Sequence, residues 1–451
     1  MRWMAGVVVG LLAGMGAVAA EASAPVAAGA AEARTEAGVP VEVDVHYDYA
    51  DETGQLWGGR VRLQIERPDR TKVIPAPVWS AWARDGSPAN RIDLVLVGDG
   101  YTATQMVTYA AHANAAMSTF FAEEPFRSYG DYFNVHRIDV VSNESGVSND
   151  PVQGITRDTA LQMHYWCGGT ERLLCVNTSL ALAYANNAPD VDMTVAGGNG
   201  WAADIALHEF GHSLGKLADE YDYGGPATYT GGEPTDRNTS KYNATQMSIN
   251  GRKWAPWLGT NLAAYDGLVS TYEGAAYSQY GIYRPTNNSK MRALGRPFNL
   301  PSCEGLILEM YKIVRPIDDA TPTELPLSAL DTVYVTPLEP TDHALEVRWY
   351  VNDELVAGAT EPELALATLP LTAGVHTLRA VVSDPTWMVR DEAARALWLT
   401  EQRTWTIVAT ELLGDLNCDG ARDTADIDAF VLALVDPAGY AAAYPACNRM
   451  L

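Results

Sequence analysis

One short segment constrains this chain more than any other feature. It is the pentapeptide HEFGH, in which His208 and His212 stand four residues apart and Glu209 lies between them. On an α-helix, residues i and i+4 share one face, so both imidazoles can reach the same metal ion. Ile205 and Leu214 add apolar side chains at helical spacing. The pattern predicts a helix that carries a metal site.

The residue types at this spacing indicate zinc. Neutral imidazole suits Zn²⁺, and a catalytic zinc site uses three protein ligands and leaves one position for water. Zinc lowers the pKa of that water to about 7, so that a nearby carboxylate can act as general base. We therefore expect His208 and His212 to bind catalytic Zn²⁺. Glu209 would take a proton from the zinc-bound water as it attacks a peptide carbonyl, and would then pass it to the leaving amine.

The identity of the third zinc ligand is open between two carboxylates. Asp219 and Glu220 follow the predicted helix directly, and either could be brought back to the histidines by a turn. A carboxylate is a suitable third ligand. The residue that does not bind zinc is expected to form an ion pair with a zinc-binding histidine or to orient it.

The segments around the motif predict a mixed α/β domain over residues 91–320. A continuous apolar run at 94–97 is typical of a strand buried on both faces. Thr102 and Gln105 form a capping box before a helix that extends to Phe120, and a further strand follows. Strand–helix–strand order is typical of α/β domains.

The flanking regions predict β structure. Alternating apolar and polar residues over 39–75 indicate the hairpins of an N-terminal β module, which we place at 37–80. Short alternating strands with turns at Asn352-Asp353 and Ala373-Gly374 predict an immunoglobulin-like β-sandwich over 324–410. That sandwich lacks the cysteine pair of antibody domains.

The tail, residues 411–451, contains an acidic loop that is typical of calcium sites. Counted from Asp415 in GDLNCDGARDTAD, oxygen donors stand at positions one, three, five, seven, nine and twelve, with glycine at six. The expected Ca²⁺ ligands are Asp415, Asn417, Asp419, the carbonyl of Ala421, Asp423 and Asp426. The last position holds Asp where an EF-hand has Glu. A short helix with an apolar face is predicted after the loop.

The N-terminus and the cysteines indicate export. Residues 1–20 combine Arg2, an apolar run and small residues suited to cleavage, which predicts a signal peptide followed by a flexible leader at 21–36. The five cysteines allow disulfides in an oxidising compartment. We expect Cys167 to pair with Cys175 and Cys418 with Cys447, which leaves Cys303 as a buried thiol. The mature protein is expected to be secreted or on the cell surface, without stable membrane insertion.

The charge of the chain argues against nucleic-acid partners. The sequence has 31 Lys+Arg against 56 Asp+Glu, a formal net charge of −25. Such a surface repels nucleic acid and anionic membranes and favours cations. The expected partner is a protein or peptide substrate.

Four segments together resemble the IgA-peptidase family of zinc metallopeptidases: LVLVGDGYT, PFRSYGDYFNV, HEFGHSLGKLADEY and SKMRALGRPFN. The resemblance covers about residues 91–315. It implies a metzincin-like catalytic domain in which a sharp turn at Gly215 follows the zinc helix. It also implies that His208 and His212 bind zinc, that Glu209 is the catalytic base and that Met291 is the Met-turn residue beneath the zinc site. In these zincins a third histidine would stand at position 218, where this chain has Ala218.

The tail also resembles half of a dockerin, because it has one calcium loop where a dockerin has two. This implies a cohesin-like partner that could anchor the enzyme.

Several alternatives remain at this stage. The chain could be a non-catalytic protein that binds peptides or glycans on a peptidase fold, although the intact Glu209 argues against it. It could instead be a tail-anchored surface-assembly component, or a zinc amidase acting on a non-peptide bond. Within the peptidase hypothesis, Met193–Ala196 is predicted to be an edge strand on which an extended peptide substrate lies.

Overall fold

The structure is a computed structural model of the 451-residue chain. It describes residues 40–50, 56–66, 78–83, 88–99, 101–139, 141, 173–177, 184–188, 193–196, 201–222, 227–409, 414–418, 423–445 and 447. The signal peptide and leader predicted at 1–36, and the predicted partner Cys167, lie outside these residues. None of the helices described is both long and apolar enough to cross a bilayer.

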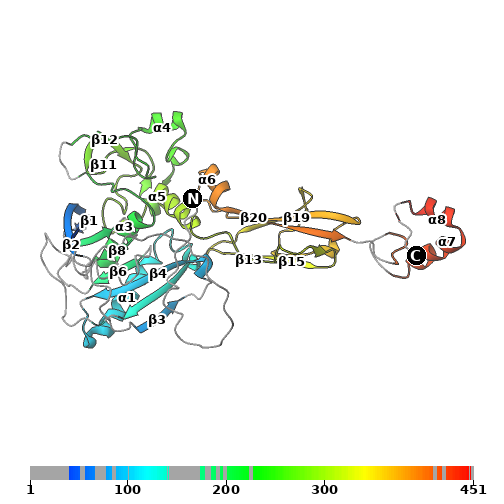
Figure 1. The fold of residues 1–451 in the computed structure, drawn as a ribbon. Helices are drawn as coiled ribbons and strands as arrows, with labels where there is room; N and C mark the ends of the chain where they lie inside the picture. The colour runs from blue at the N-terminus through cyan, green and yellow to red at the C-terminus, as the bar shows by residue number, and fades with distance from the viewer. Residues whose placement is uncertain are drawn as a thin grey trace. The chain divides into compact units, whose positions relative to one another are not determined.

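The chain divides into two compact units. The first comprises residues 1–315 together with two later segments, 339–343 and 386–398. The second comprises 316–338, 344–385 and 399–451. Figure 1 shows the elements of both units along the chain.

An eight-stranded sheet organises the first unit, in the order β2-β1-β7-β8-β6-β4-β5-β3. Its strands are β1 (Pro40–Ala50), β2 (Leu56–Glu66), β3 (Val78–Ala83), β4 (Ile92–Asp99), β5 (Phe133–Asp139), β6 (Leu173–Asn177), β7 (Tyr184–Ala188) and β8 (Met193–Ala196). The four central strands β5, β4, β6 and β8 run parallel. Parallel strands need long crossovers, and the helix α1 (Met106–Phe120) lies in the one that joins β4 to β5. The predicted mixed α/β class is confirmed.

Two helices of this unit pack against each other: α1 (Met106–Phe120) and α3 (Ala202–Ser213). The N–H of Thr102 donates to Oε1 of Gln105 at 3.0 Å, so the predicted capping box precedes α1. Phe120 of α1 meets Phe210 of α3 with ring centroids 5.1 Å apart. Because α3 also packs on β7 and β8, its motif is fixed against the sheet.

The N-terminal hairpin is part of the same sheet. β1 and β2 pair antiparallel as the sequence predicts, and β1 also pairs with β7. The residues expected as a module at 37–80 therefore supply one outer edge of the sheet, β2, and the first half of the other, β3.

The predicted substrate strand Met193–Ala196 is not at an edge. This strand, β8, pairs with β6 on one side and β7 on the other. Its backbone groups are used within the sheet, so a peptide could not add beside it. The prediction of an edge strand is wrong, because the sequence did not reveal β7.

A long segment after α3 completes the first unit. It contains α4 (Ala244–Asn250), β9 (Asn261–Leu262), β10 (Gly267–Leu268), β11 (Tyr272–Ala275), β12 (Ser278–Arg284), α5 (Leu300–Tyr311) and the later α6 (Glu392–Trp398). Short 3-10 helices occur at Pro88–Asn90, Ala103–Gln105, Gly130–Tyr132, Ala255–Trp257 and Ala263–Tyr265. Cys303 is fully buried in α5 as a free thiol, and burial raises its pKa, as expected for an inert cysteine.

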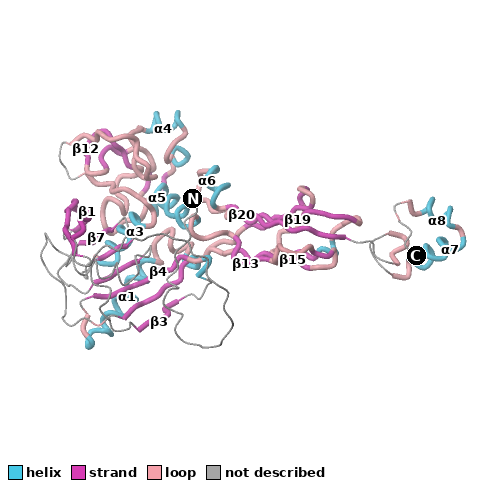
Figure 2. The backbone as a smooth tube through the Cα atoms, viewed as in Figure 1, coloured by secondary structure: helices cyan, strands magenta, loops and turns pink. Residues whose placement is uncertain are grey.

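The second unit contains two sheets (Figure 2). The three-stranded sheet consists of β13 (Ile317–Ala320), β15 (Thr332–Pro337) and β18 (Glu363–Ala365). The five-stranded sheet consists of β14 (Leu327–Ser328), β20 (Thr400–Ala409), β19 (Gly374–Ser383), β16 (Glu346–Val351) and β17 (Glu354–Leu355). A 3-10 helix lies at Leu366–Thr368. Inward residues of both sheets, including Val333, Trp349 and Trp405, form one hydrophobic core.

The tail contains two helices, α7 (Asp426–Val435) and α8 (Pro437–Ala443). A small cluster of Leu416, Ala429, Ala433 and Tyr440 holds them together. The predicted disulfide between Cys418 and Cys447 is confirmed.

Candidate metal centre

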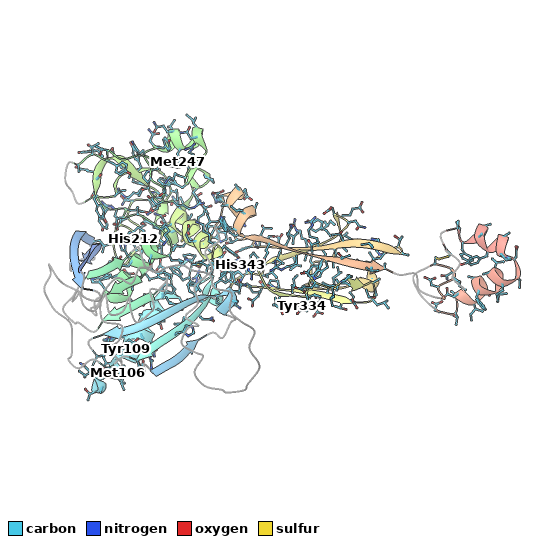
Figure 3. The ribbon with its side chains drawn as sticks, viewed as in Figure 1. Met106, Tyr109, His212, Met247, Tyr334 and His343 are labelled. Atoms are coloured by element: carbon cyan, nitrogen blue, oxygen red, sulfur yellow. A yellow bond between two sulfur atoms is a disulfide. The ribbon has the colours of Figure 1, made fainter. Side chains whose placement is uncertain are left out.

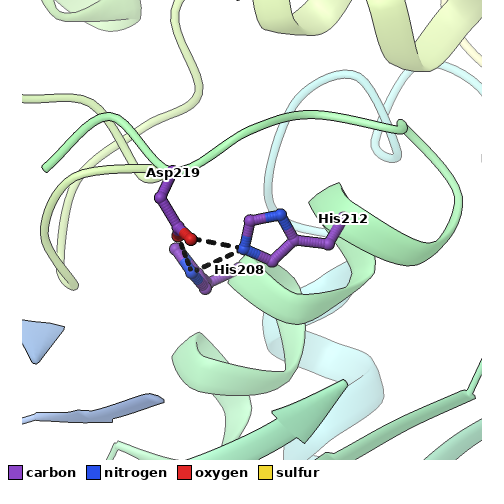
Figure 4. A group of neighbouring side chains, drawn as sticks. All are labelled: His208, His212 and Asp219. Atoms are coloured by element: carbon purple, nitrogen blue, oxygen red, sulfur yellow. Dashed lines mark hydrogen bonds and ion pairs between the residues drawn. The ribbon is translucent and has the colours of Figure 1, made fainter. Parts of the chain in front are cut away.

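Three side chains meet at the end of α3: His208, His212 and Asp219 (Figure 4). The two Nε2 atoms are 3.2 Å apart. The Oδ1 atom of Asp219 lies 3.0 Å from Nε2 of His212 and 3.3 Å from Nε2 of His208. Among the residues that the structure describes, this is the one group of acidic, histidine or cysteine side chains arranged to hold a metal ion.

Backbone carbonyls orient both imidazoles. Nδ1 of His208 lies 3.0 Å from the carbonyl oxygen of Lys290, and Nδ1 of His212 lies 2.7 Å from that of Leu217. A carbonyl can only accept, so each Nδ1 carries the proton and each Nε2 is available as a ligand. Both rings therefore present the correct nitrogen to the centre. Figure 3 labels His212 among the side chains of the unit.

The turn after α3 brings Asp219 back to the histidines. The helix ends at Ser213, and the N–H of Leu217 donates to the carbonyl of Gly211 at 3.1 Å. A Cβ on Gly215 would lie 2.6 Å from that same carbonyl, so only glycine fits in this close reversal. The chain thus reverses within a few residues.

Met291 lies directly beneath the motif helix. It is fully buried, and a Cβ placed on Gly211 would come within 2.7 Å of its sulfur. The glycine within HEFGH is therefore explained by the close approach of Met291. Met291, the predicted Met-turn residue, is therefore a close neighbour of the motif helix at Gly211.

Glu220 points away from the histidines into a different environment. It is completely buried, and its carboxylate accepts hydrogen bonds from Ser289 at 2.7 Å, Asn299 at 2.9 Å and Asn238 at 3.0 Å. Burial raises its pKa to about 7, although these hydrogen bonds act in the opposite direction. Its N–H also donates to the carbonyl of Met291 at 2.7 Å, so Glu220 ties the turn to the Met291 segment.

The charges of the three converging residues are coupled. Burial acts to lower the pKa of His212, but the carboxylate of Asp219 outweighs it and raises the pKa to about 9. Burial acts to raise the pKa of Asp219, but the two histidines outweigh it and hold that pKa well below its usual range. Glu209, on the same helix, is 1% exposed and adds to the negative potential at His212.

These residues fit a zinc ion. Around a tetrahedral Zn²⁺ with ligands at about 2.0–2.1 Å, neighbouring ligand atoms lie roughly 3.3 Å apart. The three observed separations are 3.0, 3.2 and 3.3 Å. Two nitrogens and one oxygen leave the fourth tetrahedral position for water, as in catalytic zinc sites.

A comparison with known protein families gives a match over the residues that form this site. Residues 81–195 and 190–265 match the model of the IgA Peptidase M64 family. Over these residues the chain is similar to that peptidase family. The match supports a peptidase, a class of enzyme that acts on proteins or peptides, and the matched residues include the two histidines and Asp219. A comparison with curated proteins gives no match.

Sequence reasoning missed one side chain next to the candidate metal centre. The hydroxyl of Tyr277 donates a hydrogen bond to Oδ2 of Asp219. Tyr277 lies in the turn between β11 and β12, beyond the residues that match the family. No pattern in the sequence pointed to it, because the contact spans 58 residues.

The predicted calcium residues belong to the second unit. Asp426 is buried, and its two carboxylate oxygens accept from the N–H groups of Leu416 at 2.7 Å and Asp423 at 2.8 Å. Burial alone would raise the pKa of Asp426, but these backbone groups lower it. Asp415 and Asn417 lie on the same loop, whereas the predicted ligands Asp419 and Ala421 lie outside the described residues.

Proposed function

We propose that the chain is a zinc-dependent endopeptidase whose metal ligands are His208, His212 and Asp219. The observation that carries this proposal is the convergence of two Nε2 atoms and one carboxylate oxygen at the separations of a tetrahedral zinc site. The M64 match supports a peptidase. The motif helix α3, the sharp turn at Gly215 and the buried Met291 next to the helix support a metzincin-like arrangement.

The chemistry then follows from the residues around the site. A bound zinc ion would supply a Lewis acid and lower the pKa of a water molecule. Glu209 would accept a proton from the attacking water and give it to the leaving amine nitrogen. Because Glu209 is 1% exposed, bulk water competes little for its carboxylate. Lys290 and Leu217 hold the imidazoles in the required tautomer through their carbonyls.

The test compares two substitutions in the full chain. Glu209→Gln preserves shape and removes the base, so it should retain about one zinc per chain and lose cleavage of an unfolded protein substrate. His212→Ala removes a ligand and should lose both. The proposal fails if well-folded parent protein contains no zinc, or if Glu209→Gln cleaves as fast as the parent.

The same experiment distinguishes the alternatives. A parent protein that holds zinc but cleaves no protein would favour a peptide- or glycan-binding role on the peptidase fold. Hydrolysis of small acyl substrates alone would favour an amidase. The family name does not define the substrate, and no feature of the described residues points to immunoglobulin.

The tail supports a second proposal, that it binds Ca²⁺ and docks a cohesin-like partner. In α7, Ile427, Phe430, Val431 and Leu434 follow a helical repeat, and each is 44–57% exposed. Such an apolar stripe on a short helix is typical of an interaction surface. Removal of residues 411–451 should abolish calcium-dependent binding to a cell-surface fraction. Unchanged binding would exclude the tail as the anchor.

Two further parts of the proposal concern location and architecture. The Cys418–Cys447 disulfide supports export to an oxidising compartment, in agreement with the signal peptide expected at residues 1–20. Two sheets with a shared core of alternating residues support an immunoglobulin-like sandwich in the second unit.

A further inference from the structure

The turn between β11 and β12 has an unusual backbone. Ala275 pairs with Ser278, so Ala276 and Tyr277 form a two-residue hairpin loop. Their φ angles are +44° and +60°. Both central residues of such a loop need positive φ, and the residues that adopt it readily are Gly, Asn and Asp. Ala and Tyr here hold a conformation that they rarely adopt, and such positions concentrate at functional sites.

This turn is bonded to the segment that carries Asp219. The N–H of Ala276 donates to the carbonyl of Asp219 at 2.9 Å, and the N–H of Tyr277 donates to the carbonyl of Tyr221 at 3.1 Å. The ring of Tyr277 lies 5.4 Å from that of Tyr221. The backbone of the turn is therefore held against residues 219–221, which places the hydroxyl of Tyr277 at the Asp219 carboxylate.

The two oxygens of Asp219 have different partners. Oδ1 faces both histidines, whereas Oδ2 accepts the hydrogen bond from the Tyr277 hydroxyl. A carboxylate without such a donor can rotate and bind a metal through either oxygen or both. A hydroxyl on Oδ2 fixes the rotation and leaves Oδ1 as the single ligand atom.

We propose that Tyr277 is the positioning residue of this metal centre: held by its strained turn, its hydroxyl fixes Asp219 as a one-oxygen ligand. The inference rests on the proposed function, because it assumes that Asp219 binds the metal. Tyr277 acts through Asp219 and is not assigned contact with substrate.

The test uses Tyr277→Phe in the full chain, with Tyr280→Phe as the matched control. Tyr280 lies in β12 of the same hairpin and is 46% exposed, so its variant loses a hydroxyl away from the site. Metal-free protein is titrated with zinc against a competing chelator, and the visible absorption spectrum of the cobalt-substituted protein is recorded. Loss of a group that orients a ligand typically weakens metal binding 10–100-fold.

We expect Tyr277→Phe to weaken zinc binding at least tenfold and to alter the cobalt spectrum, and Tyr280→Phe to change neither. If Tyr277→Phe has the same zinc affinity and the same cobalt spectrum as the parent protein, the inference is overturned. A parent protein that binds neither metal would instead overturn the proposed function, and the inference with it.

A second comparison separates positioning from a general loss of structure. In an Asp219→Asn background, Tyr277→Phe should have little further effect on zinc affinity, because the residue through which Tyr277 acts is already changed. An undiminished effect in that background would show that Tyr277 acts independently of Asp219, which also overturns the inference.

Discussion

The carbonyl oxygen of Lys290 lies 3.0 Å from Nδ1 of His208, although the two residues are 82 positions apart in the sequence. The side chain of Lys290 contacts the same helix, because its Nζ forms an ion pair with Asp204 in the first turn of α3. The same Nζ lies 3.8 Å from Oε2 of Glu123. With a side chain only 2% exposed, Lys290 fixes the motif helix at two points.

Replacement of this buried cation should be costly. Lys290→Met leaves Asp204 and Glu123 without their positive partner, and loss of one member of a buried ion pair typically costs about 3–5 kcal/mol. Both carboxylates are partly exposed, so we expect a decrease of about 2–3 kcal/mol in the free energy of unfolding, measured in urea. The double variant Lys290→Met/Asp204→Asn should recover part of the lost free energy of unfolding. Equal stability of the parent and Lys290→Met would contradict this prediction.

The contact between Gly211 and Met291 should show strong coupling. Gly211→Ala places a methyl group within 2.7 Å of the Met291 sulfur, so it should destabilise the protein by about 1–3 kcal/mol through overpacking. Met291→Ala removes the sulfur, so in that background Gly211→Ala should cost much less, and the ring of Phe298 at 3.1 Å is then the nearest neighbour of the added methyl group. A double-mutant cycle on denaturant unfolding measures this. Additive effects would show that the two residues do not compete for space.

Substitution of the two adjacent carboxylates should have different consequences. Asp219→Asn weakens a metal ligand, so the variant should lose most of its bound zinc. Glu220→Gln keeps the size of a residue that faces Ser289, Asn238 and Asn299, so zinc should remain near one per chain. Metal analysis after dialysis distinguishes the two variants. Zinc loss from Glu220→Gln alone would assign the third ligand to Glu220.

Zinc binding should release a proton near neutral pH. In the metal-free protein Asp219 raises the pKa of His212 to about 9, so zinc must displace the proton from this ring. The apparent zinc affinity should therefore rise about tenfold per pH unit up to about pH 9. Calorimetry at pH 7.5 in buffers of different ionisation enthalpy should detect release of at least one proton per zinc, because the zinc-bound water can add to the proton from His212. A heat that does not depend on the buffer would contradict this.

His212 and Asp219 also determine how the stability of the metal-free protein depends on pH. The raised pKa of His212 adds stability that is complete below the unfolded value of 6.5 and is lost as the pH rises through about 9. The lowered pKa of Asp219 adds stability above 3.8 that is lost as the pH falls. Thermal unfolding of metal-free protein should therefore show the largest contribution of this pair between about pH 4 and 6.5. His212→Ala should remove this contribution.

The tail loop should depend on Asp426. Its carboxylate joins Leu416 and Asp423 through their N–H groups, so Asp426→Ala should lower hydrogen-exchange protection of residues 414–447 and remove calcium binding. Asp428→Ala is the matched control, because Asp428 is exposed on the same helix. If calcium addition leaves exchange unchanged in the parent protein, the loop does not bind the ion.

Local patterns were enough to predict the core of the site. The capping box before α1, the helix over HEFGH and the strands β4 and β5 depend on neighbouring residues, and each is present. The choice between Asp219 and Glu220 depended on how the chain reverses after α3. That reversal is held by Met291 and Tyr277, which lie 72 and 58 residues beyond Asp219. Sequence spacing carries no information about such contacts.

The edge-strand prediction for β8 failed for a similar reason. Alternation and apolar content can identify a strand, but they do not identify its neighbours. β7 contains the sequence YANNA, which has little strand character, and it nevertheless pairs with β8.

The unit that carries the metal centre has no single C-terminal boundary. Residues 386–398 return to it after much of the second unit has been formed. In α5, the Glu304 carboxylate is 3% exposed and accepts from the N–H groups of Arg390 at 2.7 Å and Asp391 at 2.8 Å. A recombinant fragment cut at residue 320 would leave this carboxylate without both donors. The ribosome must therefore synthesise most of the second unit before the first can close, and expression of the peptidase region by itself would yield an incomplete fold.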